Sequence, residues 1–232
     1  LPAEGVRLPD ALSRVKERTG QKFIIIIDEW DCIFRKYPNN HEDHIRYLDF
    51  LRFWLKGKSY IALAYMTGIL PIKKYGEHSA LNMFDEYSMT NQRELAEFTG
   101  FTEAEVQELC RQYDMPYDKT KQWYDGYDLK GVQIYNPRSV VMSMLGHDYD
   151  SYWTKTETYE ALKKYIQMNQ YGLKELTTRL IAGEHIRVNP DKFQNDMTTF
   201  ASADDVLTLL VHLGYLTYDF YAQTVCIPNQ EV

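Results

Sequence analysis

Two acidic residues, Asp28 and Glu29, directly follow a run of large apolar residues, and this placement could support phosphoryl-transfer chemistry. The run, residues 23–27, is β-branched and aromatic, which is typical of a buried strand. Ligands of open parallel sheets collect at the carboxyl ends of the strands. In a Walker B strand the first acid holds Mg²⁺, usually through water, and the second polarises the attacking water. The pattern therefore makes Asp28 a candidate magnesium ligand and Glu29 a candidate catalytic residue.

A second apolar run, residues 60–66, predicts a neighbouring buried strand that ends at Thr67. In ATPases with a Walker B strand, the strand beside it ends in a polar sensor of the γ-phosphate or the lytic water. Thr67 is placed to be that sensor and is a second candidate catalytic residue. The alternative is structural, with Asp28, Glu29 and Asp31 only capping a helix that follows a core strand.

The sequence contains no phosphate-binding loop of the GxxxxGK[ST] type. Such a loop supplies backbone N–H groups for the phosphates, together with a lysine and a hydroxyl for Mg²⁺. We therefore expect half of an ATP site and no ATP turnover by this chain alone. The chain starts at Leu1 without a methionine and ends at Val232 after an extended-looking segment, which favours a piece of a longer protein.

The elements around these residues predict an α/β fold. A helix between two buried strands is the βαβ pattern of a parallel sheet. We expect helices over residues 9–18, 44–55, 103–113 and 139–145, and strands over 23–27, 60–66 and, more briefly, 84–89. Thr102 and Glu105 form a capping-box pattern, and Asn136 is placed to cap the helix that follows Pro137.

The C-terminal third has the element order of a winged helix. Three helices are expected over residues 157–168, 172–182 and 203–213, followed by a hairpin of residues 215–218 with 224–227. The predicted organisation is a partial P-loop-NTPase-type core over residues 1–95, a mostly helical lid or connector over 96–155, and a winged-helix-like region over 156–232.

Several short blocks, taken in order along nearly the whole chain, resemble the bacterial AAA-ATPase-like domain proteins. They are Ile26–Asp31, Tyr65–Tyr75, Ser79–Asn82, Gly100–Glu103, Trp123–Tyr127, Tyr135–Pro137, Tyr152–Thr154, Leu213–Leu216 and Ile227–Asn229. The resemblance implies an ATPase whose P-loop lies upstream of this chain, with a helical lid, a winged-helix-like region and a downstream PD-(D/E)XK nuclease-like domain. It implies Asp28 and Glu29 as the Walker B acids and Thr67 as the sensor.

The resemblance also implies cofactors and partners. Mg²⁺ and ATP would serve the intact protein, and neither is expected to bind this chain tightly by itself. The P-loop segment and the nuclease-like domain are the implied partners, while a second copy or another protein is left open. Because the P-loop strand is missing, we expect a partial sheet whose gap is closed by another pairing or a partner chain. The competing function is a non-catalytic ATPase-like scaffold or protein-interaction module.

A few other residues are weaker candidates for binding a nucleotide or a metal ion. Arg138 follows the Asn136–Pro137 helix start and could act as an arginine sensor on ATP, or else form a surface salt bridge. The aromatic block at Trp123–Tyr127 could stack on a base, although packing between layers explains it better. Lys73 and Lys74 could meet phosphates or be solvated. His41 and His44 suggest a metal only superficially, because a polar loop before a helix accounts for them.

Composition disfavours DNA binding, zinc binding and a membrane span. The net charge of −7 disfavours DNA binding, and so do Asp204 and Asp205 in a helix that carries no Lys or Arg through Leu213. The three cysteines form no CxxC pair, which indicates reduced thiols and disfavours zinc. No apolar run reaches the ~20 residues of a membrane span, so we expect a cytoplasmic protein.

Overall fold

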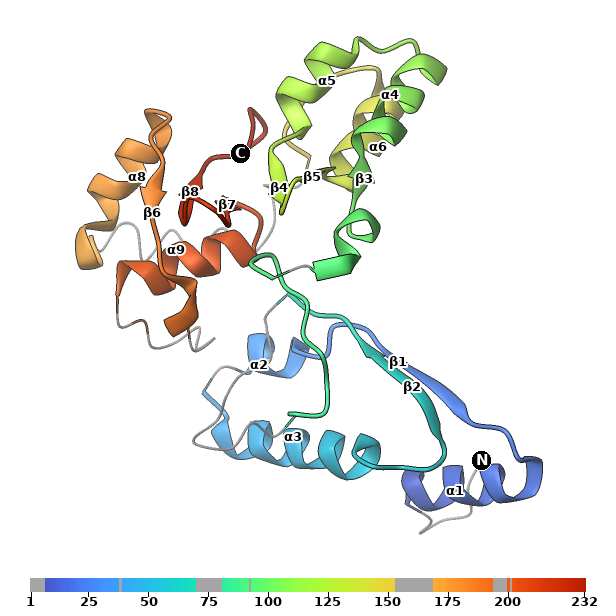
Figure 1. Ribbon diagram of the computed structural model, residues 1–232. Coiled ribbons are helices and arrows are strands. Elements are labelled where there is room, and N and C mark those ends of the chain that lie inside the picture. Colours follow the sequence, from blue (N-terminus) through green and yellow to red (C-terminus); the bar gives the residue numbers. More distant parts are fainter. Residues whose placement is uncertain are drawn as a thin grey trace. The chain divides into compact units, whose positions relative to one another are not determined.

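The computed structural model describes residues 7–37, 39–69, 81–91, 93–152, 169–193, 200 and 202–232 (Figure 1). These residues form two units, the first reaching to Glu86 and the second starting at Tyr87. No helix within the described ranges has the length and apolar character needed to cross a membrane. All three cysteines are free thiols.

The first unit is a small α/β assembly built around two parallel strands. Its elements are α1 (Leu8–Thr19), β1 (Phe23–Ile27), α2 (Cys32–Lys36), α3 (His41–Leu55) and β2 (Ile61–Met66). β1 pairs with β2 in parallel, ending at Ile27 opposite Met66. This confirms the expected strand–helix–strand order and the mixed α/β class. α3 begins earlier than expected, at His41, because the Asn40 side chain caps it by accepting from the Asp43 N–H.

Only one face of this sheet is covered. Ile25 and Ile27 pack with Leu48 and Leu51 of α3, which lies along that face (Figure 1). The opposite face is apolar and open, formed by residues that are 49–72% exposed. These are Ile24, Ile26, Leu63 and Tyr65. The prediction of buried strands is therefore wrong for this face, because no described element covers it.

The third strand expected over residues 84–89 is not formed. Ser88 and Asn91 instead make an isolated bridge, with reciprocal N–H to carbonyl bonds of 3.0 and 2.9 Å. The bridge turns the chain back on itself at Met89 and Thr90, so the segment cannot run on as a sheet strand. Among the described residues the parallel sheet thus has two strands, well short of a five-stranded core.

The second unit opens with helices around a three-stranded antiparallel sheet of order β3-β5-β4. Its elements are the 3₁₀ helix η1 (Arg93–Phe98), β3 (Phe101–Thr102), α4 (Glu103–Gln112), α5 (Tyr117–Tyr124), β4 (Tyr127–Leu129), β5 (Val132–Tyr135) and α6 (Pro137–Gly146). The capping box of Thr102 with Glu105 and the Asn136 cap are confirmed. α5 and the β4–β5 hairpin occupy a stretch in which we predicted no helix or strand.

The rest of the second unit forms another three-stranded antiparallel sheet, of order β6-β8-β7. The elements are η2 (Gln170–Gly172), α8 (Leu173–Ile181), β6 (Ile186–Arg187), η3 (Pro190–Lys192), α9 (Ala203–His212), β7 (Thr217–Asp219) and β8 (Thr224–Cys226). α8, α9 and the final hairpin confirm the expected elements, whereas β6 was not predicted. The helix expected over residues 157–168 lies outside the described residues. α9 is the most buried helix here, with every residue from Val206 to Val211 inside the core.

Candidate functional site

The carboxyl ends of β1 and β2 bring Asp28 and Thr67 into direct contact. The Thr67 hydroxyl donates a hydrogen bond to Asp28 Oδ1, and the backbone N–H of Glu29 donates to the same oxygen at 2.9 Å. The strand ends are also joined through the backbone. Thr67 N–H donates to the Ile27 carbonyl, and Trp30 N–H donates to the Thr67 carbonyl, each at 2.9 Å. Parallel pairing therefore places the candidate acid beside the candidate sensor.

Asp28 keeps one carboxylate oxygen available. Its side chain is exposed, and no described residue donates a hydrogen bond to Oδ2. Mg²⁺ in nucleotide sites usually keeps several waters and uses one or two carboxylates. A solvent-facing carboxylate with one oxygen fixed by two donors fits that role, so Asp28 could hold a hydrated Mg²⁺.

Glu29 occupies a strained backbone position immediately after the strand. Its φ is +50°, in the left-handed region that costs an ordinary residue about 1 kcal/mol. Such strain is concentrated at functional sites. The Glu29 side chain is 67% exposed, and Arg35 Nη2 donates to its Oε2 at 3.0 Å. Glu29 is thus both accessible to water and ion-paired.

Trp30 and Asp31 are buried against Gly68, directly behind the acids. A Cβ at position 68 would lie 2.6 Å from Trp30 Cδ1 and 2.9 Å from Asp31 Oδ1, so a glycine is needed for this approach. The Asp31 side chain is 1% exposed and pairs with Arg35, whose Nε lies 3.2 Å from Asp31 Oδ2. Asp31 makes no side-chain cap to α2, contrary to the capping interpretation. It is a buried anchor for Arg35.

Arg138 belongs to the second unit, in the first turn of α6, where its backbone N–H donates to Asn136 Oδ1 at 3.0 Å. Its side chain is exposed, and its guanidinium forms no ion pair within the described part of the chain. Lys73 and Lys74 lie outside the described residues.

The histidine pair lies at the start of a helix, and one of the two rings is packed in the core. His41 and His44 both lie at the start of α3, and His44 is buried against Phe34, with Nε2 2.8 Å from the Tyr37 carbonyl. No three or more His, Cys, Asp or Glu residues in the described ranges are grouped so that they could hold a metal ion. The two histidines start the helix and do not form the predicted polar loop before it.

The aromatic block is a packing element, and it forms the end of α5 and the start of β4. Tyr124 is fully buried and stacks on Tyr149, with ring centroids 6.1 Å apart. Tyr127 is 6% exposed, and its hydroxyl donates to the Gly214 carbonyl at 2.8 Å. The predicted packing between layers is therefore confirmed, and neither tyrosine offers a free ring face for a base.

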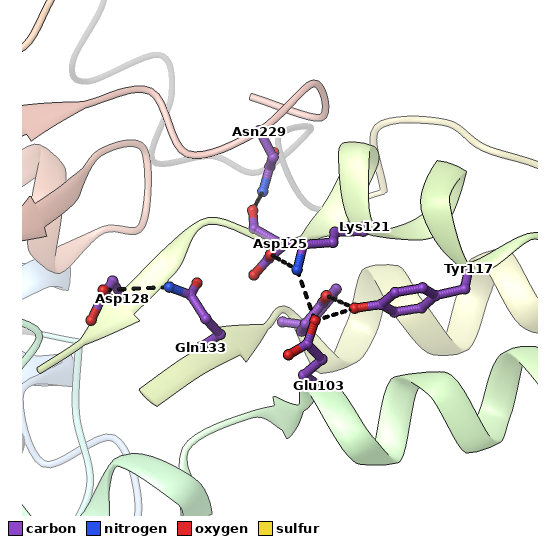
Figure 2. A network of polar contacts seen from close by, with 8 residues as sticks. Glu103, Tyr117, Lys121, Asp125, Asp128, Gln133 and Asn229 are labelled. Atoms are coloured by element: carbon purple, nitrogen blue, oxygen red, sulfur yellow. Dashed lines mark hydrogen bonds and ion pairs between the residues drawn. The ribbon is translucent and has the colours of Figure 1, made fainter. Parts of the chain in front are cut away.

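Sequence reasoning missed a polar network between α4 and α5 (Figure 2). Lys121 Nζ lies 2.7 Å from Glu103 Oε1 and 3.6 Å from Asp125 Oδ2, while the Tyr117 hydroxyl donates to Glu103. The hydrogen bond from Lys121 lowers the pKa of Glu103, and the same bond raises the pKa of Lys121. Burial raises the pKa of Tyr135, which meets Tyr117 at 3.2 Å, so that phenol stays protonated and is no base. The network ties two helices together. The four-residue spacing of Lys121 and Asp125, which allows an ion pair on a helix, was the sequence feature that could have indicated this network.

A second missed feature joins two of the sequence blocks. The segment of residues 228–232, called here the C-terminal strap, lies across the end of α5. Asn229 Nδ2 donates to the Asp125 carbonyl at 2.8 Å (Figure 2), and Gln230 N–H donates to the Gln122 carbonyl at 3.3 Å. Gly126 has a φ of +108°, and a Cβ there would lie 2.0 Å from the Pro228 carbonyl oxygen. The glycine is therefore required by both the backbone angle and the close approach.

The strap ends in a buried carboxylate. Glu231 is 3% exposed, and its Oε1 accepts from the Ser139 hydroxyl at 2.7 Å and from Tyr152 N–H at 2.8 Å. The Ser151 hydroxyl donates to the Glu231 backbone carbonyl at 2.7 Å. Hydrogen bonds from α6 and from the segment after it hold Oε1 of this buried carboxylate, so the strap is a structural part of the second unit.

Comparison with known proteins gives one distant relative. The chain is 22% identical over 159 residues to an uncharacterized protein in the vnfD 5' region of Azotobacter chroococcum mcd 1, an overlap of 66% of this chain and 30% of that protein. The chain therefore spans under a third of the length of the curated relative it matches. No family model matches the chain, and no solved structure does at a significant level.

Proposed function

We propose that this chain is the Walker B half and lid of an AAA-type ATPase of the bacterial AAA-ATPase-like kind. The contact between Thr67 and Asp28 carries the proposal, because parallel pairing sets an acid and a hydroxyl side by side at the ligand-binding edge of a sheet. In this proposal Asp28 holds Mg²⁺, Glu29 orients the attacking water and Thr67 senses the γ-phosphate. Arg138 of the second unit is the proposed arginine sensor of ATP in the intact protein.

The open sheet face supports the same proposal. Parallel sheets occur almost only with both faces covered, yet Ile24 and Ile26 of β1 are 64% and 72% exposed. The distant relative is much longer than the matched segment. A P-loop segment elsewhere in the longer protein would add a strand to this sheet and bring the glycine-rich loop to the edge that carries Asp28. It would also supply elements to cover the apolar face.

The C-terminal part of the second unit fits the proposal of a winged-helix-like region that binds a partner protein. The order α8, β6, α9, β7, β8 with sheet order β6-β8-β7 fits that architecture. α9 stands where a recognition helix would be, but its residues 206–211 are buried and Asp204 and Asp205 lie in its first turn. A helix with this burial and charge is poorly suited to a DNA groove. We therefore infer a protein contact and no direct DNA binding by this region.

The experiment that tests the ATPase proposal compares two proteins. Mg-ATP is titrated calorimetrically into this chain and into the full-length natural protein, and hydrolysis is then measured with Glu29→Gln in the latter. We expect no binding by this chain, binding by the full-length protein, and loss of turnover in the variant with binding kept. Unchanged hydrolysis in Glu29→Gln would refute the assignment.

A second candidate, a non-catalytic scaffold, is favoured by one observation. Glu29 is ion-paired to Arg35, as expected of an acid that stabilises a fold. Absence of ATP binding by the full-length protein would support this function over the first. The winged-helix-like region would then be the part that docks a partner.

A further inference from the structure

Arg35 connects the buried anchor Asp31 to the exposed acid Glu29. Its Nε lies 3.2 Å from Asp31 Oδ2, and its Nη2 donates to Glu29 Oε2 at 3.0 Å. The guanidinium is planar and presents its donors in a fixed fork. The ion pair with Asp31 holds the guanidinium by charge, without a hydrogen bond from Nε to a described residue, and Nη2 is presented to Glu29 from that position.

The anchor Asp31 is buried and closely packed. Asp31 is 1% exposed and starts α2, and Gly68 lies against it with no room for a Cβ. Gly68 follows Thr67, so the loop that packs on the anchor is continuous with the loop that carries the sensor. Arg35 is 27% exposed, which places the link between the buried and the solvated part of this edge.

Glu29 needs such a support. Its side chain is 67% exposed and its backbone already lies at a φ of +50°, so without a partner the carboxylate would sample many rotamers in water. Arg35 engages Oε2 and leaves Oε1 without a hydrogen bond from the described residues. One oxygen is thus held by the protein while the other is available to accept a hydrogen bond from water.

We propose that Arg35 is a positioning residue that holds the Glu29 carboxylate in place for the attacking water, with Asp31 as its anchor. This inference rests on the proposed function. Positioning errors of about 1 Å can lower turnover by ~100-fold without altering substrate affinity. Loss of Arg35 should therefore lower kcat by about 10- to 100-fold and leave the KM for ATP unchanged.

The test measures kcat and KM for Mg-ATP in the full-length natural protein and its Arg35→Ala variant. The matched control is Arg46→Ala, because Arg46 lies in the same unit but is 71% exposed and, among the described residues, pairs with the exposed acids Glu42 and Asp43. Arg35→Ala removes the ion-pair partner Arg35 from the buried Asp31 carboxylate, which can unfold the unit. The double variant Asp31→Asn/Arg35→Gln removes that charge and keeps the side chains polar. Arg35→Lys should restore only part of kcat, since an ammonium lacks the fork.

The outcomes distinguish a failure of the Arg35 inference from a failure of the ATPase proposal. A lowered kcat with unchanged KM in both the Arg35→Ala and the double variant, and normal kinetics in Arg46→Ala, supports the inference. Normal or raised kcat in the Arg35 variants, while Glu29→Gln is inactive, overturns the inference and leaves the ATPase proposal standing. Full activity of Glu29→Gln, or no hydrolysis by the full-length protein, overturns the proposed function and this inference with it.

Discussion

Replacing Gly126 by alanine should weaken the second unit strongly, and by more than its backbone angle alone explains. An alanine at a φ of +108° costs about 1–2 kcal/mol in backbone strain. Its Cβ would also lie 2.0 Å from the Pro228 carbonyl oxygen, which belongs to backbone and can yield only if the C-terminal strap moves. Displacing the strap breaks the bonds that Asn229 and Gln230 make to α5 and the loop after it, at about 1 kcal/mol each. The expected loss is therefore about 3–4 kcal/mol.

Gly131→Ala is the matched control for this prediction. Gly131 also has a positive φ, of +91°, but nothing lies within 4 Å of the Cβ position, so only the backbone strain applies. Urea unfolding followed by circular dichroism should give a loss of about 1–2 kcal/mol for the control and about 2 kcal/mol more for Gly126→Ala. Hydrogen exchange in residues 228–232 should accelerate only in Gly126→Ala. Equal losses in both variants, with the strap still protected, would refute the reasoning.

Three further predictions follow from single residues. Burial lowers the pKa of His212 to about 4, below its ordinary 6.5. As the pH falls, the unfolded chain therefore binds a proton at His212 before the folded chain does. The free energy of unfolding should fall by up to about 3 kcal/mol as the pH drops from about 6.5 to 4. Urea midpoints across this range should show the fall in the wild type and lose most of it in His212→Leu. Gly68→Ala should destabilise the first unit by about 1–3 kcal/mol, because buried Trp30 leaves no space for the added Cβ. The control Gly57→Ala meets no atom within 4 Å and should show only the cost of backbone strain in the same unfolding assay. Lys121→Met should cost less than about 1 kcal/mol in that assay, since the Lys121 side chain is 44% exposed, and a loss above about 3 kcal/mol would contradict this view of the network.

The sequence predicted the elements whose signals are local. Thr102 with Glu105 and Asn136 before Pro137 identified two helix starts, because caps are made within one turn of chain. The run at residues 23–27 identified β1, and its pairing with β2 followed from the helix between them. The contact of Asp28 with Thr67 then needed no further information than parallel register.

What the sequence could not give are features made by distant residues. Gly126 and Pro228 both lay in recognised blocks, but nothing local indicates that they meet across more than a hundred residues. The strand expected over residues 84–89 did not form because two backbone hydrogen bonds between Ser88 and Asn91 fold the end of that stretch into a turn. Arg35 went unnoticed because its importance depends on the burial of Asp31, which only packing against Gly68 produces.

The open face of the β1–β2 sheet has a practical consequence for handling the isolated chain. Ile24, Ile26, Leu63 and Tyr65 form an apolar surface beside strand edges that no described strand pairs with. Such surfaces associate with copies of themselves, and the association strengthens on warming because apolar hydration becomes less favourable. Light scattering of the isolated chain should therefore rise with temperature and protein concentration before the α3 helix melts. Charged substitutions at Ile24 and Ile26 would suppress the scattering and leave the covered face of the sheet intact.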